Sequence, residues 1–139
     1  MTDNKKIKIH VKNNHWAPGS FPTDAEGEKN FTITKEHLDE ALKSYPEIKE
    51  KLEIFVDWDE DNFEKSMLNS DILLTWNFPT KNLKKISPNL KWIHVVSAGV
   101  EHLLPLDWMF NDLVLTNSSG VHAKKAGEYG LMSILMLQN

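Results

Sequence analysis

The alternation of strand-like and helix-like segments predicts a parallel α/β sheet with right-handed crossovers. Five short apolar segments rich in branched residues are separated by helical patterns or polar loops along the 139 residues, as expected for repeated strand–helix units. The third segment, residues 71–76 (DILLTW), is almost continuously apolar. Such a run is typical of a strand that is buried on both faces of a parallel sheet.

The predicted strands share alternating or continuous apolar character, and they occupy residues 7–11, 52–58, 71–76, 91–96 and 113–117. Residues 13–30 are polar and contain two prolines and two glycines, so they predict a long surface loop of the kind that often carries function. No repeat, low-complexity tract or clear domain boundary interrupts the pattern.

Helices are predicted between these strands. Thr34 is suited to cap a helix that runs to about residue 43, and its expected inner face consists of Leu38, Ala41 and Leu42. Residues 61–68 predict a short amphipathic helix with Phe63 and Leu68 directed inward. A further short helix ends near residue 86, before Ser87-Pro88.

The last helix, predicted over residues 122–137, is apolar nearly all round after residue 129. Such a helix is buried or docks against a partner, and the small residues Ala126 and Gly130 allow a close backbone approach. Neither a capping glycine nor a closing strand follows it. We therefore expect this chain to be truncated relative to its parent protein.

Composition excludes several function classes. The chain has no cysteine, and hence no disulfide, thiolate nucleophile or cysteine metal site. Its net charge of −4 argues against nucleic acid or an acidic membrane as partner. The N-terminus lacks the apolar region of a signal peptide, and the longest apolar run is too short to span a bilayer, so we expect a cytoplasmic protein. All 16 basic residues are lysine, although arginine is the usual carboxylate ligand.

Three strand–helix junctions are candidate ligand sites, because open α/β sheets bind ligands at the carboxyl ends of their strands. The junction "VVSAGVEH" suits an anion best, since Ala98, Gly99 and Val100 could offer backbone N–H groups at the start of a helix. From these residues alone, a tight packing turn remains the simpler interpretation.

The six histidines give no catalytic or metal signature. His94 lies in an apolar strand and fits a core histidine, while His102 and His122 lie near predicted helix starts. None has a carboxylate partner that the sequence can place, and no metal-ligand spacing links them. The sequence also contains no G-x-G-x-x-G, no P-loop and no G-x-S-x-G.

Residues 90–137 resemble the D-isomer-specific 2-hydroxyacid dehydrogenases. The resemblance is carried by "NLKWIHVVSAGVEHLL" and by "LVLTNSSGVHAKKAGEYGLMSILML". It implies a flavodoxin-like, three-layer α/β/α domain with a five-stranded parallel sheet over residues 1–121. Residues 122–139 would then begin an interdomain helix that leads to an absent NAD(P)-binding domain.

The resemblance also implies where the substrate, a small 2-hydroxy or 2-keto acid, is held. The residues concerned lie at the carboxyl ends of the third and fourth predicted strands: Trp76, Asn77, Ala98, Gly99 and Val100. The three backbone amides would hold the substrate carboxylate, and the loop at Trp76 would form another wall. Val121 is a weaker candidate, and Glu101 stands where aspartate is more usual.

The same resemblance assigns no catalytic or cofactor-binding residue to this chain. The family's catalytic arginine, glutamate and histidine would lie in the missing domain, so neither His122 nor Glu128 takes a catalytic role. NAD or NADP would bind only to the full-length parent. This leaves two hypotheses, an inactive substrate-binding domain of a dehydrogenase and a stand-alone flavodoxin-like binding or regulatory module whose last helix forms a homodimer.

Overall fold

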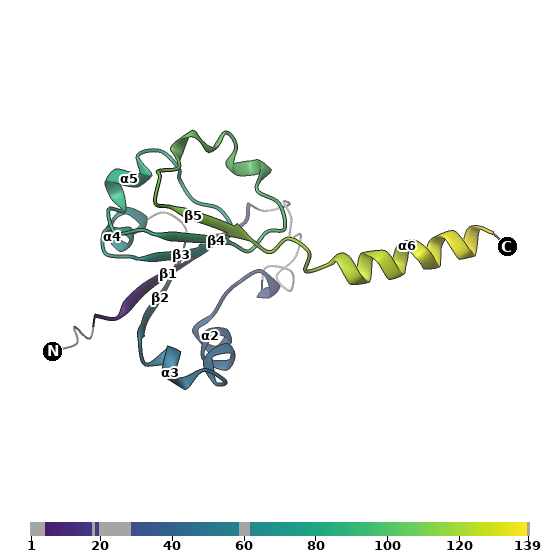
Figure 1. Cartoon of the computed structure of the whole chain (residues 1–139), viewed down its shortest axis with the longest axis horizontal. Helices are drawn as coiled ribbons and strands as arrows, with labels where there is room; N and C mark the ends of the chain where they lie inside the picture. Colours follow the sequence, from purple (N-terminus) through teal and green to yellow (C-terminus); the bar gives the residue numbers. More distant parts are fainter. Residues whose placement is uncertain (1–4, 18, 20–28, 59–61, 139) are drawn as a thin grey trace.

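The computed structural model describes residues 5–17, 19, 29–58 and 62–138. Its five parallel strands lie in the order β2-β1-β3-β4-β5 (Figure 1), and their bounds are β1 Ile7–Asn13, β2 Leu52–Trp58, β3 Ile72–Thr75, β4 Trp92–Val95 and β5 Val114–Asn117. The predicted parallel five-stranded α/β sheet is confirmed. The strand order is that of flavodoxin-like doubly wound sheets.

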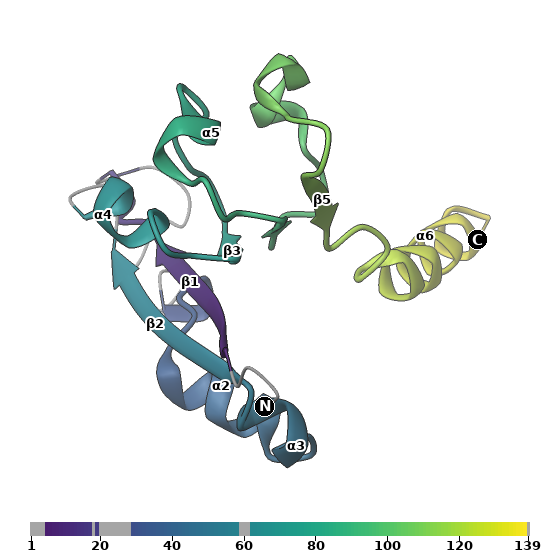
Figure 2. The same ribbon diagram turned by 60° about the vertical axis from the view of Figure 1, so that its left-hand side comes forward.

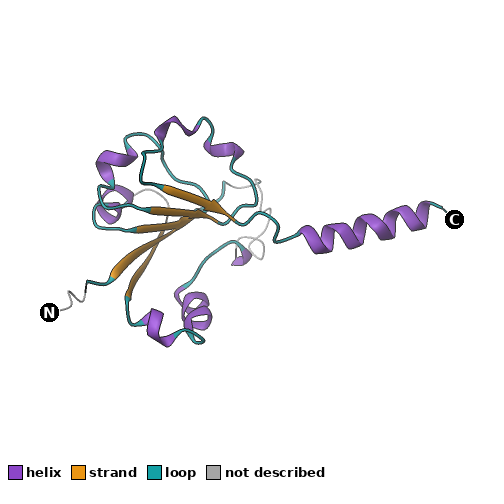
Figure 3. Ribbon diagram, viewed as in Figure 1, coloured by secondary structure: helices purple, strands orange, loops and turns teal. Residues whose placement is uncertain are grey.

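The helices form two layers on opposite faces of this sheet (Figures 2 and 3). One layer holds α2 (Lys35–Leu42) and α3 (Pro46–Lys49), and it lies beside β1 and β2. The other holds α4 (Phe63–Met67), α5 (Leu83–Ile86) and the 3₁₀ turns η1 (Glu101–Leu103) and η2 (Leu106–Trp108). β2 is added on one side of β1, and the later strands are added on the other side. Because the crossovers are right-handed, this change places the later helices on the other face of the sheet.

The hydrophobic core lies between the sheet and the layer of α4 and α5. Leu73, Ile93 and Val95 are fully buried there and pack with Phe63 and Met67 of α4. On the opposite side of β3, Ile72 is only half-buried. The prediction that this strand is buried on both faces is therefore wrong, because no described helix covers that side of it.

Two predicted inward positions are also wrong. Leu68 is 52% exposed, because α4 spans only Phe63–Met67 and its inward stripe is the i, i+4 pair of its first and last residues. In α2, Ala41 is exposed, whereas Leu38 and Leu42 are half-buried as expected. The predicted cap is confirmed, since the His37 backbone N–H donates to Thr34 Oγ1 at 3.2 Å.

The helix expected after Gly99 is a single 3₁₀ turn, η1. Pro105 explains the difference, because a residue that precedes proline is disfavoured in helical conformation. Leu104 accordingly adopts extended backbone angles of φ −76° and ψ 148°. The short helix α3, which begins at Pro46, was not predicted from the sequence.

Helix α6 (Ala123–Leu137) begins one residue later than predicted and projects from the body of the molecule (Figure 1). None of its residues is buried, so the expectation that it is buried within this chain is wrong. The alternative, that it docks against a partner, remains a prediction. Within the part of the chain that the structure describes, no helix is both long and apolar enough to cross a membrane. The division of the chain near residue 121 remains a prediction.

Candidate functional site

A hollow of about 310 Å³ lies at the carboxyl edge of the sheet, beyond the ends of β1 and β3. Its lining residues come from three separate segments: Asn14, His15, Trp16, Trp76, Asn77 and His102. The parallel topology explains this convergence, because it brings the ends of neighbouring strands to one edge. Two predicted site residues, Trp76 and Asn77, belong to this hollow.

Two side chains hold the backbone carbonyl of Asn77 in place by hydrogen bonds. The Lys12 ammonium donates to the Asn77 carbonyl at 3.0 Å, and the Thr75 hydroxyl donates to the same oxygen at 2.9 Å. The Asn77 side-chain oxygen in turn accepts from the Phe78 backbone N–H at 2.9 Å. Its side-chain NH₂ is therefore the group that Asn77 can offer to a ligand.

Trp76 forms an aromatic wall with two rings from the segment that follows β1. Its ring centroid lies 5.7 Å from that of Trp16 and 5.1 Å from that of Phe31, both in edge-to-face geometry. Such pairs add stability beyond their area of burial. The wall is thus a firm apolar surface beside the polar groups of Asn14 and Asn77.

The turn after β4 has its carbonyl groups satisfied by the fold. Ser97 Oγ donates to the Gly99 carbonyl at 2.7 Å, and Asn117 Nδ2 donates to the Ala98 carbonyl at 3.0 Å. The backbone N–H groups of Ala98, Gly99 and Val100 donate to no residue that the structure describes. Three successive amides without a described acceptor are suited to an anionic ligand.

The Glu101 side chain lies directly against Gly99. A Cβ atom added at Gly99 would overlap the carboxylate of Glu101. Glycine here therefore permits close contact, whereas Gly120 takes the left-handed backbone with φ 87°. A ligand carboxylate that binds at this turn would have to displace the Glu101 carboxylate, because two negative charges in contact repel each other.

The predicted site residues fall into two groups that His102 joins. Its Nε2 lies 3.2 Å from the Trp76 carbonyl, so η1 contacts the wall of the hollow. The turn at Ala98–Val100 does not itself line the hollow. Sequence reasoning missed Asn14, His15 and Trp16, and the only signal for them was that they open a long polar loop.

His94, on β4 before the turn, contacts residues of β5 and the segment that follows it. Its Nδ1 lies 2.9 Å from Thr116 Oγ1 and its Nε2 lies 3.4 Å from Ser118 Oγ. Burial lowers the pKa of His94, since desolvation disfavours the charged ring. The side chain thus holds β4 and β5 together as a neutral group near pH 7. Among the described residues, no cluster of three acidic or histidine side chains could hold a metal ion.

Comparison with known proteins gives one structural likeness. No protein-family model matches the sequence, and no protein of curated function matches it. A solved structure to which the chain is similar is that of a D-isomer specific 2-hydroxyacid dehydrogenase family protein from Klebsiella pneumoniae 342, with 22% identity and a TM-score of 0.49. The match covers 94% of this chain and 34% of that one, so this chain spans about a third of that protein's length.

Proposed function

We propose that this chain is the substrate-binding domain of an NAD(P)-dependent D-2-hydroxyacid dehydrogenase. The observation that carries the proposal is the turn at Ala98–Val100, whose three amides donate to no described acceptor. The η1 turn that follows it contacts the aromatic-walled hollow through His102. The sequence resemblance over residues 90–137 supports the same assignment. The substrate would be a small 2-hydroxy or 2-keto acid.

Each part of the site has a role in this proposal. The backbone amides of the turn hold the substrate carboxylate, and the rigid wall at Trp76 limits the size of the substituent on the reacting carbon. Donors that are fixed in place before the ligand arrives bind it at a lower entropic cost. The Asn77 side-chain NH₂ supplies a further donor at the rim.

The chain's own residues do not fit a dinucleotide. No glycine-rich phosphate-binding sequence follows any of its strands. In this proposal NAD or NADP, and the groups that move the proton, belong to a further domain of the parent. The 139-residue chain is therefore expected to catalyse no hydride transfer.

A titration followed by amide NMR tests the binding role. We expect pyruvate to shift the amide resonances of Ala98, Gly99 and Val100, and acetone, which lacks the carboxylate, to leave them unchanged. Equal shifts with acetone, or pyruvate shifts confined to other segments, would rule out the carboxylate site. Oxidation of any 2-hydroxy acid by the isolated chain with NAD or NADP would contradict the assignment of catalysis to a further domain.

Replacing Glu101 tests the same turn, because the proposal predicts the direction in which the affinity for pyruvate changes. Glu101→Gln removes the negative charge that lies against Gly99, so pyruvate should bind about two- to fivefold more tightly, the effect expected of one exposed charge pair. Glu47→Gln makes the same change on the distant helix α3 and should leave the affinity unaltered. Weaker binding by Glu101→Gln would mean that the carboxylate of Glu101 assists the ligand.

A further inference from the structure

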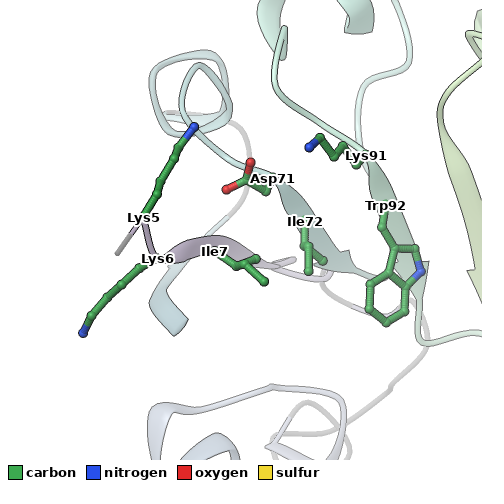
Figure 4. A pocket seen from close by; sticks show the side chains of 7 residues that line it. All are labelled: Lys5, Lys6, Ile7, Asp71, Ile72, Lys91 and Trp92. Atoms are coloured by element: carbon green, nitrogen blue, oxygen red, sulfur yellow. The ribbon is translucent and has the colours of Figure 1, made fainter. Parts of the chain in front are cut away.

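The hollow at the carboxyl edge of the sheet has no lysine, aspartate or glutamate among its described lining residues. A hollow of similar volume, about 330 Å³, lies at the opposite edge, and Figure 4 shows that three lysines and one aspartate surround it: Lys5, Lys6, Lys91 and Asp71. A charged group that entered the carboxyl-edge hollow would lose water without gaining a lining residue of opposite charge. This hollow therefore suits an uncharged polar group.

Asn14 is a lining residue whose hydrogen bonds the fold leaves unmade. Its side-chain oxygen is buried and has no partner among the described residues. A buried polar atom without a partner destabilises the folded state, and such atoms are rare in native proteins. The χ2 torsion of asparagine is soft, so a modest rotation turns either end of the amide toward the hollow. A ligand that bonds to this amide removes the cost of leaving it unpaired.

Asn77 offers the complementary group in a fixed orientation. Its side-chain oxygen accepts from the Phe78 backbone N–H, so its NH₂ group is left to donate. Its backbone carbonyl is held by Lys12 and Thr75. A hydroxyl group both donates and accepts hydrogen bonds. An acceptor on Asn14 and a donor on Asn77 together therefore match a ligand hydroxyl.

The aromatic residues of the hollow supply its apolar part. Trp16 and Trp76 lie in edge-to-face contact with ring centroids 5.7 Å apart, and His15 is stacked on Trp58 at 4.5 Å. These rings offer apolar contact to the carbon atoms of a ligand, as in most small-molecule sites, where a few polar groups fix the orientation. A carbon chain that carries hydroxyl groups satisfies the rings and the amides together.

We propose that the hollow selects a 2-hydroxy or 2-keto acid whose side chain is uncharged and carries hydroxyl groups, with Asn14 as a specificity-determining residue. The inference rests on the proposed function, because it places the carboxylate of the same acid at Ala98–Val100. That turn does not itself line the hollow, and η1 joins the two through His102. An acid of several carbons, rather than pyruvate, is therefore needed to occupy both.

Two acids of equal chain length test this selection. Gluconate and 2-hydroxyhexanoate are both 2-hydroxy acids, but only gluconate carries hydroxyl groups along the rest of its chain. We expect gluconate to bind at least about tenfold more tightly, because the apolar chain leaves the asparagine amides unpaired. In NMR titrations, both acids should shift the backbone amides of Ala98–Val100, and gluconate should also shift the side-chain NH₂ resonances of Asn14.

Asn14→Leu isolates the role of this side chain. Leucine has a similar branched shape but makes no hydrogen bond, so the affinity for gluconate should fall about tenfold while that for 2-hydroxyhexanoate is unchanged or higher. The melting temperature should not fall, since the variant removes an unpaired buried oxygen. Asn111→Leu makes the same change at an exposed position outside the hollow, and it should bind both acids like the wild type.

The possible outcomes separate this inference from the proposed function. If neither acid shifts the amides of Ala98–Val100, the proposed function fails, and the inference that rests on it fails as well. If both acids shift these amides but bind with equal affinity, the carboxylate site stands and the inference alone is overturned. A lower melting temperature of Asn14→Leu with equal weakening of both acids would also overturn it, because Asn14 would then have only a structural role.

Discussion

At the scale of single residues, the ionisation of the buried His10 couples stability to pH. It is fully buried on β1, with its Nδ1 3.2 Å from Met67 Sδ and its ring stacked on Phe55. Desolvation lowers the pKa of His10 from 6.5 to about 4, opposed in part by the negative charge of Asp57. The folded protein therefore holds this ring neutral in a range where the unfolded chain protonates it.

The sign of the resulting pH dependence follows from proton binding. Between pH 6.5 and pH 4 the unfolded state binds more protons, so the free energy of unfolding should fall as the pH falls. A pKa difference of about 2.5 corresponds to at most about 3 kcal/mol. Denaturant titrations of His10→Phe, which keeps a stacking ring, should lack this component of the slope. The exposed His122→Gln is the control, and an unchanged slope in His10→Phe would assign the effect to other groups.

Residue-level prediction from the sequence succeeded where neighbours along the chain decide the outcome. The Thr34 cap depends on a hydrogen bond to a residue three positions away, and the pattern around it was sufficient. Asn14, His15 and Trp16 join the site only through tertiary contacts with residues near position 76. No local pattern contains that information. The sequence therefore identified the turn at Ala98–Val100 and the loop at Trp76, but not the segment of residues 14–16 that lines the hollow.

At the scale of elements, α4 offers two adjacent apolar residues with opposite environments. Met67 is fully buried against the sheet, and Leu68 is 52% exposed. Met67→Ala should lower the free energy of unfolding by about 2–5 kcal/mol, because it removes buried volume and leaves a cavity. Leu68→Ala should change it by less than about 0.5 kcal/mol. Equal losses in a chemical denaturation experiment would contradict the inward stripe described for α4.

The strands were predicted more accurately than the helices, and the reason is physical. Parallel pairing follows from the alternation of strands and helices, which is a property of the whole chain. The short helices α4 and α5 have only five and four residues, so a shift of one residue reverses which side chains point inward. Leu68 was misplaced for this reason, and the helix expected after Gly99 failed because Pro105 ends it after one turn.

At the scale of the whole molecule, a packed sheet is joined to a helix, α6, that has no buried residue. An isolated helix of 15 residues is marginally stable in water, and most helical stability in proteins comes from packing. The strands β1, β3 and β4 lie at the centre of the sheet, and β3 and β4 contribute to the hydrophobic core. Opening of α6 therefore should not require opening of the sheet.

Amide hydrogen exchange distinguishes the helix from the sheet. In dilute solution, the amides of α6 should exchange quickly while those of β3 and β4 stay protected. Protection of α6 that is already complete in dilute solution would mean that the helix packs on its own chain.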